Sequence, residues 1–217
     1  SASQSLEAAY AFTPEKARAQ IPGTVLWYHG LSAAHIEHNG TAIADFRLLL
    51  ARRLEMEKSD SVTRFAVLPS NNVRYVLATT LRRAGHTREA AEEFRTVLTN
   101  DLSFEMAHAQ LADIAEQEQA WDVAVQERER ALEASPADPG LLLDYGTTLA
   151  RARRFKEAMA VLAQAEEAMP LNARVPYLRG QAAVADGQTD AAMLAFRRFA
   201  AIAPTRYGSQ VKQLEAK

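Results

Sequence analysis

The sequence predicts an all-α protein built from a repeated helix–turn–helix unit. Prolines recur every 34 residues, small residues recur at the same spacing in other columns, and no strand-length stretch alternates β-branched and polar residues. The rest of the chain is rich in Ala, Leu, Glu and Arg, which favour helices. Together these features predict a helical repeat and give no support for a sheet.

Several columns of residues keep this period. Pro136, Pro170 and Pro204 form one column, and each proline is expected to close the second helix of its unit because it cannot continue a helix. The other columns hold Gly or Ala, since a larger side chain where two helices cross closely would push their backbones apart. These small residues are Ala90, Ala124, Ala158 and Ala192 in one column, and Ala78, Ala112, Gly146 and Gly180 in the other.

The columns resemble the pattern of the tetratricopeptide repeat (TPR) family, W-x2-L-G-x2-Y, then A-x3-F, then P. The resemblance implies a right-handed superhelical solenoid of about five helix–turn–helix units, with extra helices at both ends. The expected segments are an N-terminal helical extension 1–22, a degenerate unit 23–56, an insertion or loop 57–70, units 71–104, 105–138, 139–172 and 173–206, and a C-terminal capping helix 207–217. The sequence departs from the pattern where Arg128 replaces an aromatic residue of the second helix, where His29 and Arg179 replace a core leucine, and where Leu54 and Leu102 replace the closing proline.

The turns and the insertion carry further expectations. Gly85 and Gly187 are expected to end the first helix of their units in the left-handed conformation that glycine adopts at low cost. Gln119 and Arg153 stand in that place in the middle repeats, so these turns are expected to use another route. Segment 57–70 is expected to extend the preceding helix and then form a loop that packs on the stack, with a lid or docking segment as the alternative.

Composition limits the partners and the compartment. Lys and Arg number 25 and Asp and Glu 27, which gives a net charge of −2, so the chain lacks the basic stripe of a nucleic-acid binder and a polybasic membrane anchor. No apolar run reaches the length of a membrane span. The absence of cysteine excludes disulfides, thiol catalysis and Cys-ligated zinc, and fits the cytoplasm or a bacterial periplasm equally.

No catalytic motif is found, so the protein is expected not to be an enzyme and to carry no cofactor. The sequence lacks a nucleophile elbow, a phosphate loop, an HExxH motif and a nucleotide-binding fingerprint. His35 and His38 lie three residues apart, but no third metal ligand is placed beside them. Solvated histidines near the Asn39-Gly40 turn are the favoured interpretation, and no metal site is predicted.

The resemblance implies one site, the concave groove lined mainly by the first helix of each unit. Repeat positions 2, 5, 9, 12 and 13 face this groove in the family, and they combine aromatic anchors with mixed charges that suit a partner helix or an extended peptide. Packing of Trp27 and the tyrosines inside the repeats is the alternative. The expected partner-binding residues are Trp27, Leu31, Asn72, Tyr75, Thr79, Arg82, Arg83, Asp113, Leu143, Thr147, Arg151, Arg174, Tyr177 and Gln181, with Met106, Ala109 and Glu116 in the same columns.

These features favour a non-enzymatic interaction module, such as a scaffold, adaptor or assembly factor. Family members that clamp the carboxylate tail of chaperones use Lys and Asn where Tyr75 and Thr79 stand, so a chaperone-tail clamp is not expected. The alternatives are a self-assembling structural protein, including a homo-oligomer, and the TPR region of a larger enzyme or of a secretion or envelope machine.

Overall fold

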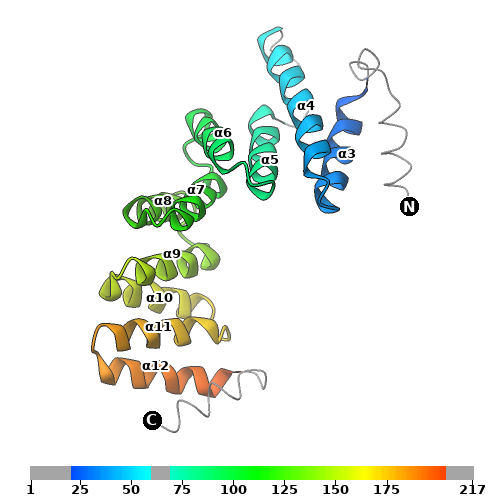
Figure 1. Cartoon of the computed structure of the whole chain (residues 1–217). Coiled ribbons are helices and arrows are strands. Elements are labelled where there is room, and N and C mark those ends of the chain that lie inside the picture. The colour runs from blue at the N-terminus through cyan, green and yellow to red at the C-terminus, as the bar shows by residue number, and fades with distance from the viewer. Residues whose placement is uncertain (1–20, 60–68, 204–217) are drawn as a thin grey trace. The chain divides into compact units, whose positions relative to one another are not determined.

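The computed structural model describes residues 21–59 and 69–203, and every regular element in these ranges is an α-helix (Figure 1). The ten helices are α3 (Gly23–His35), α4 (Asn39–Ser59), α5 (Ser70–Arg83), α6 (Thr87–Asn100), α7 (Glu105–Gln117), α8 (Trp121–Ala134), α9 (Pro139–Arg151), α10 (Phe155–Ala168), α11 (Arg174–Ala185) and α12 (Thr189–Ile202). The predicted all-α class is therefore confirmed. The expected N-terminal extension and the C-terminal capping helix fall almost wholly outside the described residues.

The helices pack as successive hairpins within two compact units, residues 1–102 and residues 103–217. In the first unit, α3 pairs with α4 and α5 with α6, and α4 packs against α5. In the second, α7 pairs with α8, α9 with α10 and α11 with α12, while α8 contacts α9 and α10 contacts α11. In each hairpin the first helix is called the A helix and the second the B helix.

Glycine in the small-residue columns lets the A and B helices approach closely. A Cβ atom on Gly180 would lie 2.5 Å from a ring carbon of Phe196, and one on Gly146 would lie 2.7 Å from Leu162 Cγ. Ala78 and Ala112, which hold the same position in two other repeats, are fully buried. The columns thus mark the places where a B-helix side chain rests directly on the A-helix backbone.

The A helices end in the same left-handed turn whether or not glycine is present. Gly85 and Gly187 have φ of 85° and 75°, and Gln119 and Arg153 have φ of 58° and 61°. In each turn the following residue donates a backbone hydrogen bond to the residue five positions earlier, as from Ala120 N to Ala115 O at 2.8 Å. The expectation that the middle repeats turn by another route is wrong, because two L-residues adopt the strained conformation instead.

Helix α4 is longer than a standard repeat helix and ends near the start of α5. It spans 21 residues to Ser59, as expected for an extended B helix ahead of the insertion, whose residues 60–68 lie outside the described part of the chain. The Glu57 carboxylate accepts a hydrogen bond from Ser70 Oγ at 2.9 Å and another from Ser70 N at 3.2 Å. These bonds connect the ends of α4 and α5 across the insertion.

Candidate partner-binding faces

In the first unit, the aromatic residues of the predicted site pack partly into the repeats. The Trp27 ring meets Phe46 with centroids 5.7 Å apart, and Tyr75 meets Phe94 at the same separation. Both A-helix rings stay partly exposed, so each combines a packing role with some accessible surface. Of the two alternatives for these aromatics, packing inside the repeats is therefore observed, while both side chains keep some exposed surface.

Two of the polar residues predicted on α5, Thr79 and Arg83, donate hydrogen bonds to backbone oxygens. Thr79 Oγ1 donates to the backbone oxygen of Tyr75 at 3.0 Å, so it serves its own helix. Arg83 Nη2 donates to Ala34 O at 3.0 Å and ties α5 to the last turn of α3, although its side chain remains exposed. Asn72 is exposed and Arg82 is half-buried, while Leu31 on α3 is also exposed.

In the second unit, the predicted residues include two that the core absorbs. Leu143 is 7% exposed and packs with Leu142, Leu162 and Val175, and buried Thr147 donates its hydroxyl to Leu143 O at 2.7 Å. Neither side chain offers a partner appreciable surface. The physical reason is that α9 lies between hairpins and is packed by α8, α10 and α11.

The exposed members in the second unit lie on three successive A helices. Asp113 on α7 is partly exposed, and Arg151 on α9 and both Arg174 and Gln181 on α11 are exposed. Tyr177 is partly buried, with its ring 5.1 Å from that of Phe199. We call the side of α7, α9 and α11 that carries these five residues the A-helix face.

A buried cation lies beneath this face. Arg128 stands where Phe46, Phe94, Leu162 and Phe196 stand in the other hairpins, and its side chain is only 7% exposed. Its Nη2 donates to Asp113 Oδ1 at 2.6 Å and to Glu116 Oε1 at 3.0 Å, both on α7.

The same guanidinium also reaches α9. Arg128 Nε donates to Thr148 Oγ1 at 3.2 Å, and Nη1 lies 4.0 Å from Asp144 Oδ2. Arg151 closes the network by donating to the second oxygen of Glu116. The six residues of this group, called the Arg128 cluster, are Asp113, Glu116, Arg128, Asp144, Thr148 and Arg151.

The Arg128 cluster combines well-paired and poorly paired charges. Burial would raise the pKa of Glu116, but hydrogen bonds from Thr148 and Arg128, together with the Arg128 charge, outweigh it and lower the pKa below its usual value. Burial instead raises the pKa of Asp144, since the attraction of Arg128 and Arg174 does not offset burial and the repulsion from Asp113 and Glu116. Negative charge is therefore well compensated at Glu116 and under-compensated at Asp144.

Sequence reasoning identified Arg128 only as a departure from the repeat pattern, and it missed Asp144 and Thr148. One signal was available. An arginine in the B-helix aromatic column occurs in the same repeat as carboxylates at A-helix positions 9 and 12, Asp113 and Glu116. A cation that replaces a core aromatic residue needs buried acceptors, and these were the nearest in register.

Three other carboxylates pair with A-helix histidine or arginine side chains inside their own hairpins. Each directly precedes the aromatic column of the B helix: Asp45 pairs with His29, Glu93 with Arg74 and Glu127 with His108. The His108 Nδ1 to Glu127 Oε2 distance is 2.7 Å, and His29 and Asp45 are both buried. Arg179, which also replaces a core leucine, lies 2.8 Å from Glu166. The departures from the repeat pattern are thus matched by local charge partners.

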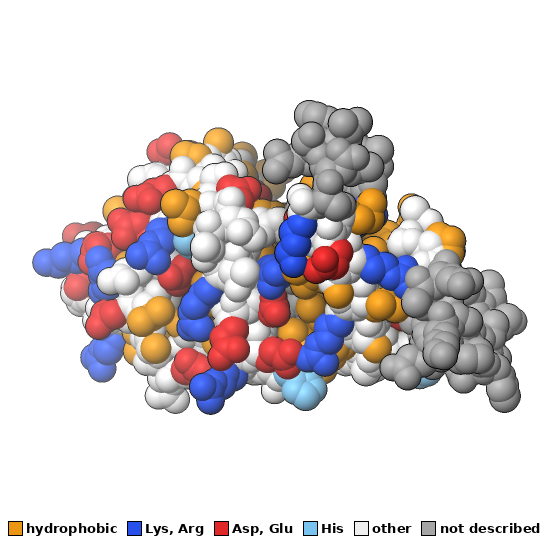
Figure 2. Space-filling model, turned by 90° about the horizontal axis from the view of Figure 1, so that it is seen from above, with side chains coloured by type: hydrophobic (Ala, Val, Ile, Leu, Met, Phe, Trp, Pro, Cys, Tyr) orange, Lys and Arg blue, Asp and Glu red, His pale blue; other side chains and the backbone are white. Residues whose placement is uncertain are grey.

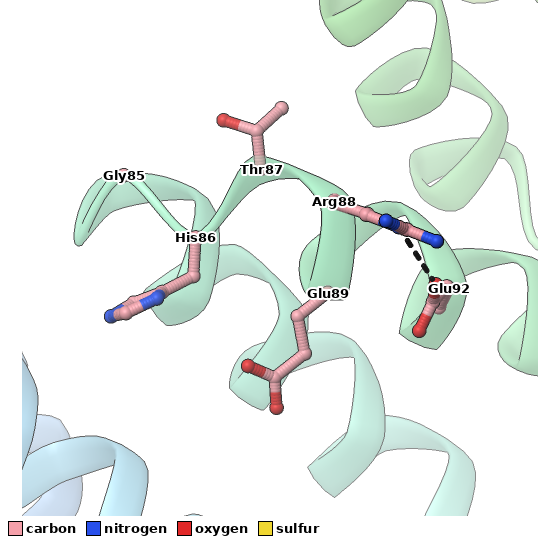
Figure 3. A pocket seen from close by; sticks show the side chains of 6 residues that line it. All are labelled: Gly85, His86, Thr87, Arg88, Glu89 and Glu92. Carbon is pink, nitrogen blue, oxygen red and sulfur yellow. Dashed lines mark ion pairs between the residues drawn. The ribbon is translucent and has the colours of Figure 1, made fainter.

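A surface hollow lies away from the predicted site. It has a volume of about 470 Å³ and is lined by Gly85, His86, Thr87, Arg88, Glu89 and Glu92 at the α5–α6 turn (Figure 3). None of these residues belongs to the predicted site, and none is apolar, whereas small-molecule pockets are mostly apolar. Arg88 and Glu92 pair across one side of it at 3.5 Å. The hollow is therefore not a candidate site.

The described residues also give no grouping that suggests a metal centre or a membrane segment. In residues 21–59 and 69–203, no three His, Asp or Glu side chains come together as a metal site would require. Within the same ranges, no helix has both the length and the apolar character needed to cross a bilayer. On the face drawn in Figure 2, basic and acidic side chains are interspersed.

Comparison with known proteins identifies the repeat. The tetratricopeptide repeat family model matches residues 75–139 and 143–207, which together make up more than half of the chain. The chain therefore belongs to the tetratricopeptide repeat family. Its repeats are those of a protein-interaction scaffold, a class of fold that is generally non-enzymatic.

Solved structures share this fold at low sequence identity. A structure of MamA from AMB-1 is 18% identical with a TM-score of 0.63, and the alignment covers 82% of this chain and 89% of that one. Another MamA structure has a TM-score of 0.67 at 15% identity, with the same coverage. YrrB, described as a TPR protein with an unusual peptide-binding site, has a TM-score of 0.65 at 16% identity and covers 84% of this chain and 87% of its own. Among curated proteins, none matches the chain in sequence.

Proposed function

We propose that this protein is a non-enzymatic interaction module that binds a helix or an extended peptide of another protein on its A-helix face. The observation that carries the proposal is the composition of that face in the second unit. It presents Asp113, Arg151, Arg174 and Gln181 to solvent around a partly exposed Tyr177 ring. An aromatic edge among mixed charges suits a peptide that buries one apolar side chain and pairs several polar ones.

The rigidity of the face supports the same proposal. Asp113 and Arg151 are both bonded within the Arg128 cluster, so their positions are fixed before a partner arrives. A preformed face loses little conformational entropy on binding, which favours affinity. YrrB, which has a similar fold, is described as having a peptide-binding site, and a comparable role here is part of the proposal.

A double variant that reverses one charge and adds another tests this function. The chain with Arg174→Glu and Gln181→Glu is compared with a control carrying Lys156→Glu and Arg197→Glu on the exposed surfaces of α10 and α12. Partners captured from the native lysate are identified by quantitative mass spectrometry, and the purified partner segment is then titrated by calorimetry. We expect the A-helix variant to lose the partner while the control keeps it.

Two outcomes would contradict the proposal. Equal loss of partner in both variants would show that binding depends on general charge, and equal retention would place the partner elsewhere on the chain. Circular dichroism melts of each variant ensure that lost binding is not lost folding. The variants avoid Tyr75 and Arg82 because Tyr75 packs against Phe94, and replacing it would mix packing with binding.

Self-association is a second candidate, favoured by one observation. Helix α3 exposes Val25, Tyr28 and Leu31, and Ile36 directly after its end is exposed as well; Tyr28 is 69% exposed. Multi-angle light scattering of the parent chain and of Tyr28→Glu tests it. Oligomers that Tyr28→Glu dissociates would support this function, and a monomer at high concentration would exclude it.

A further inference from the structure

The repeat formed by α7 and α8 differs from its neighbours in charge as well as in its buried arginine. These two helices carry seven carboxylates and two arginines. Arg128 is bonded to Asp113 and Glu116, and Arg130 to Glu127, so both arginines are already engaged by carboxylates of the same hairpin. By contrast, α11 and α12 carry four arginines and one aspartate. The hairpin therefore has a local excess of negative charge that the near-neutral net charge of the chain hides.

The Arg128 cluster determines where this negative charge reaches the A-helix face. Glu116 is nearly buried and bonded to Arg128, Arg151 and Thr148, so it is directed inward. Asp113 and Asp144 are the solvent-facing carboxylates, and 49% of the Asp144 side chain is exposed. Both approach the same guanidinium from opposite helices, Asp113 from α7 and Asp144 from α9. The buried arginine thus holds two outward carboxylates beside each other.

The Arg128 charge is shared at this point, although Arg151 also pairs with Glu116 and Arg174 also attracts Asp144. Arg128 is shared among three carboxylates, and its contact with Asp144 is the longest at 4.0 Å. Burial raises the pKa of Asp144, repulsion from Asp113 and Glu116 adds to this effect, and the attraction of Arg128 and Arg174 does not offset them. An additional cation next to Asp113 and Asp144 would lower the electrostatic energy of both.

The surface beside the carboxylates suits the stem of a long cationic side chain. Met106 lies two turns before Asp113 on α7, on the same side of the helix, and it is 46% exposed. Lysine and arginine place an aliphatic stem along apolar surface and keep the charged head in a polar environment. Met106 offers the apolar surface, and the two aspartates offer the acceptors.

We propose that Asp113 and Asp144, positioned by Arg128, form a subsite that receives a lysine or arginine side chain of the bound partner. The inference rests on the proposed function and specifies the chemistry of its partner, a peptide with a basic residue. Arg128 is a positioning residue in this scheme, because it holds both carboxylates without reaching the ligand.

The test uses a defined probe rather than the unknown partner. A short fluorescein-labelled lysine–alanine peptide is titrated by fluorescence anisotropy at low salt, together with the same peptide after acetylation of each lysine. We expect the parent chain to bind the unmodified peptide and to lose most of that binding on acetylation. The variant Asp113→Asn with Asp144→Asn should weaken binding about tenfold, as expected for the loss of two partly screened charge contacts.

A control variant with the same loss of charge distinguishes binding at the subsite from general electrostatic attraction between the peptide and the chain. Glu129→Gln with Glu133→Gln removes the same two charges from exposed positions on α8 and should leave affinity within about twofold. If the double aspartate variant unfolds, Asp144→Asn alone is used, because Asp144 makes the weakest contact with Arg128. Equal weakening in the subsite variant and the control would overturn the proposal, as would equal binding of the acetylated peptide.

The remaining outcomes distinguish this inference from the proposed function. If the native partner is lost from the Arg174→Glu and Gln181→Glu variant but is unaffected by the Asp113 and Asp144 changes, the A-helix face binds a partner and the basic subsite is refuted. If light scattering shows oligomers that the aspartate changes dissociate, the occupant is a second copy of this chain, and the proposal of a separate basic peptide is overturned.

Discussion

Replacement of Arg128 by methionine measures how strongly the buried guanidinium stabilises the α7–α8–α9 packing. Methionine keeps an unbranched stem that fills similar space, but it donates none of the hydrogen bonds that Arg128 makes to Asp113, Glu116 and Thr148. Removing one partner of a buried ion pair commonly destabilises a protein by about 3–5 kcal/mol, because the other charge stays buried and unpaired. The variant leaves an excess of buried negative charge.

The structure favours the lower end of that range. Asp113 is partly exposed and can be hydrated once Arg128 is gone, and Glu116 keeps its contacts with Arg151 and Thr148. We therefore expect the free energy of unfolding to fall by about 3 kcal/mol at neutral pH. Part of the loss should disappear in acid, because the pKa of Glu116 is lower in the folded chain than in the unfolded chain. Ionised Glu116 therefore stabilises the fold above the unfolded-state pKa, and this stabilisation is lost as the pH falls through the folded-state pKa.

Urea unfolding followed by far-UV circular dichroism is the measurement. Arg128→Met, Glu116→Gln and the double variant form a thermodynamic cycle, and coupling of about 1–3 kcal/mol is expected for directly bonded charges. A control, Arg153→Met, removes an exposed arginine from the same unit. If Arg128→Met were as stable as the parent chain, or if the two single losses simply added, the guanidinium would not hold the cluster.

Three further predictions concern turns, packing and pH. Arg153→Gly should raise the free energy of unfolding by about 0.5 kcal/mol in urea titrations, because glycine adopts the observed φ of 61° without steric cost; a loss of stability would contradict this. Gly180→Ala should lower it by about 1–3 kcal/mol, since the new Cβ would lie 2.5 Å from the Phe196 ring, whereas Gly40→Ala, with no atom within 4 Å, should not; equal effects would refute the packing argument. Asp144→Asn should stabilise the fold at neutral pH and lose this advantage in acid, because a raised folded-state pKa means that ionised Asp144 opposes folding; stability measured against pH would show the reverse trend if the Asp144 charge were well paired.

The repeat could be predicted from sequence because its signals are local and recur at a fixed spacing. Gly146 and Gly180 mark contacts that a Cβ would block, and the structure places Leu162 and Phe196 against them. Each small residue sets the helix–helix contact of its own hairpin only, and the same small residue 34 positions later identifies the next hairpin. The fold class could therefore be predicted from the columns of recurring residues within this one sequence.

Features that depend on conformational strain could not be predicted in the same way. Gln119 and Arg153 carry no residue signal for a left-handed turn, since L-residues rarely adopt it. Each of these turns joins the A and B helices of one hairpin, and their packing against each other is a constraint that the local sequence does not show. Burial was a second feature that the sequence did not show. Family position placed Leu143 and Thr147 on an accessible face, but three neighbouring helices bury this part of α9.

The polar side-chain pairs between helices differ in how far their effects extend. His29, Arg74 and His108 each find a carboxylate on the B helix of their own hairpin, so a change at any of them acts within one repeat. Arg128 instead joins α7 and α8 to Asp144 and Thr148 of the next repeat. Since contacts in repeat proteins are mainly between nearest neighbours, a residue that bonds to two consecutive A helices controls their relative placement. Arg128 therefore couples the stability of this unit to the geometry of the A-helix face, whereas the other three pairs link only the two helices of one hairpin.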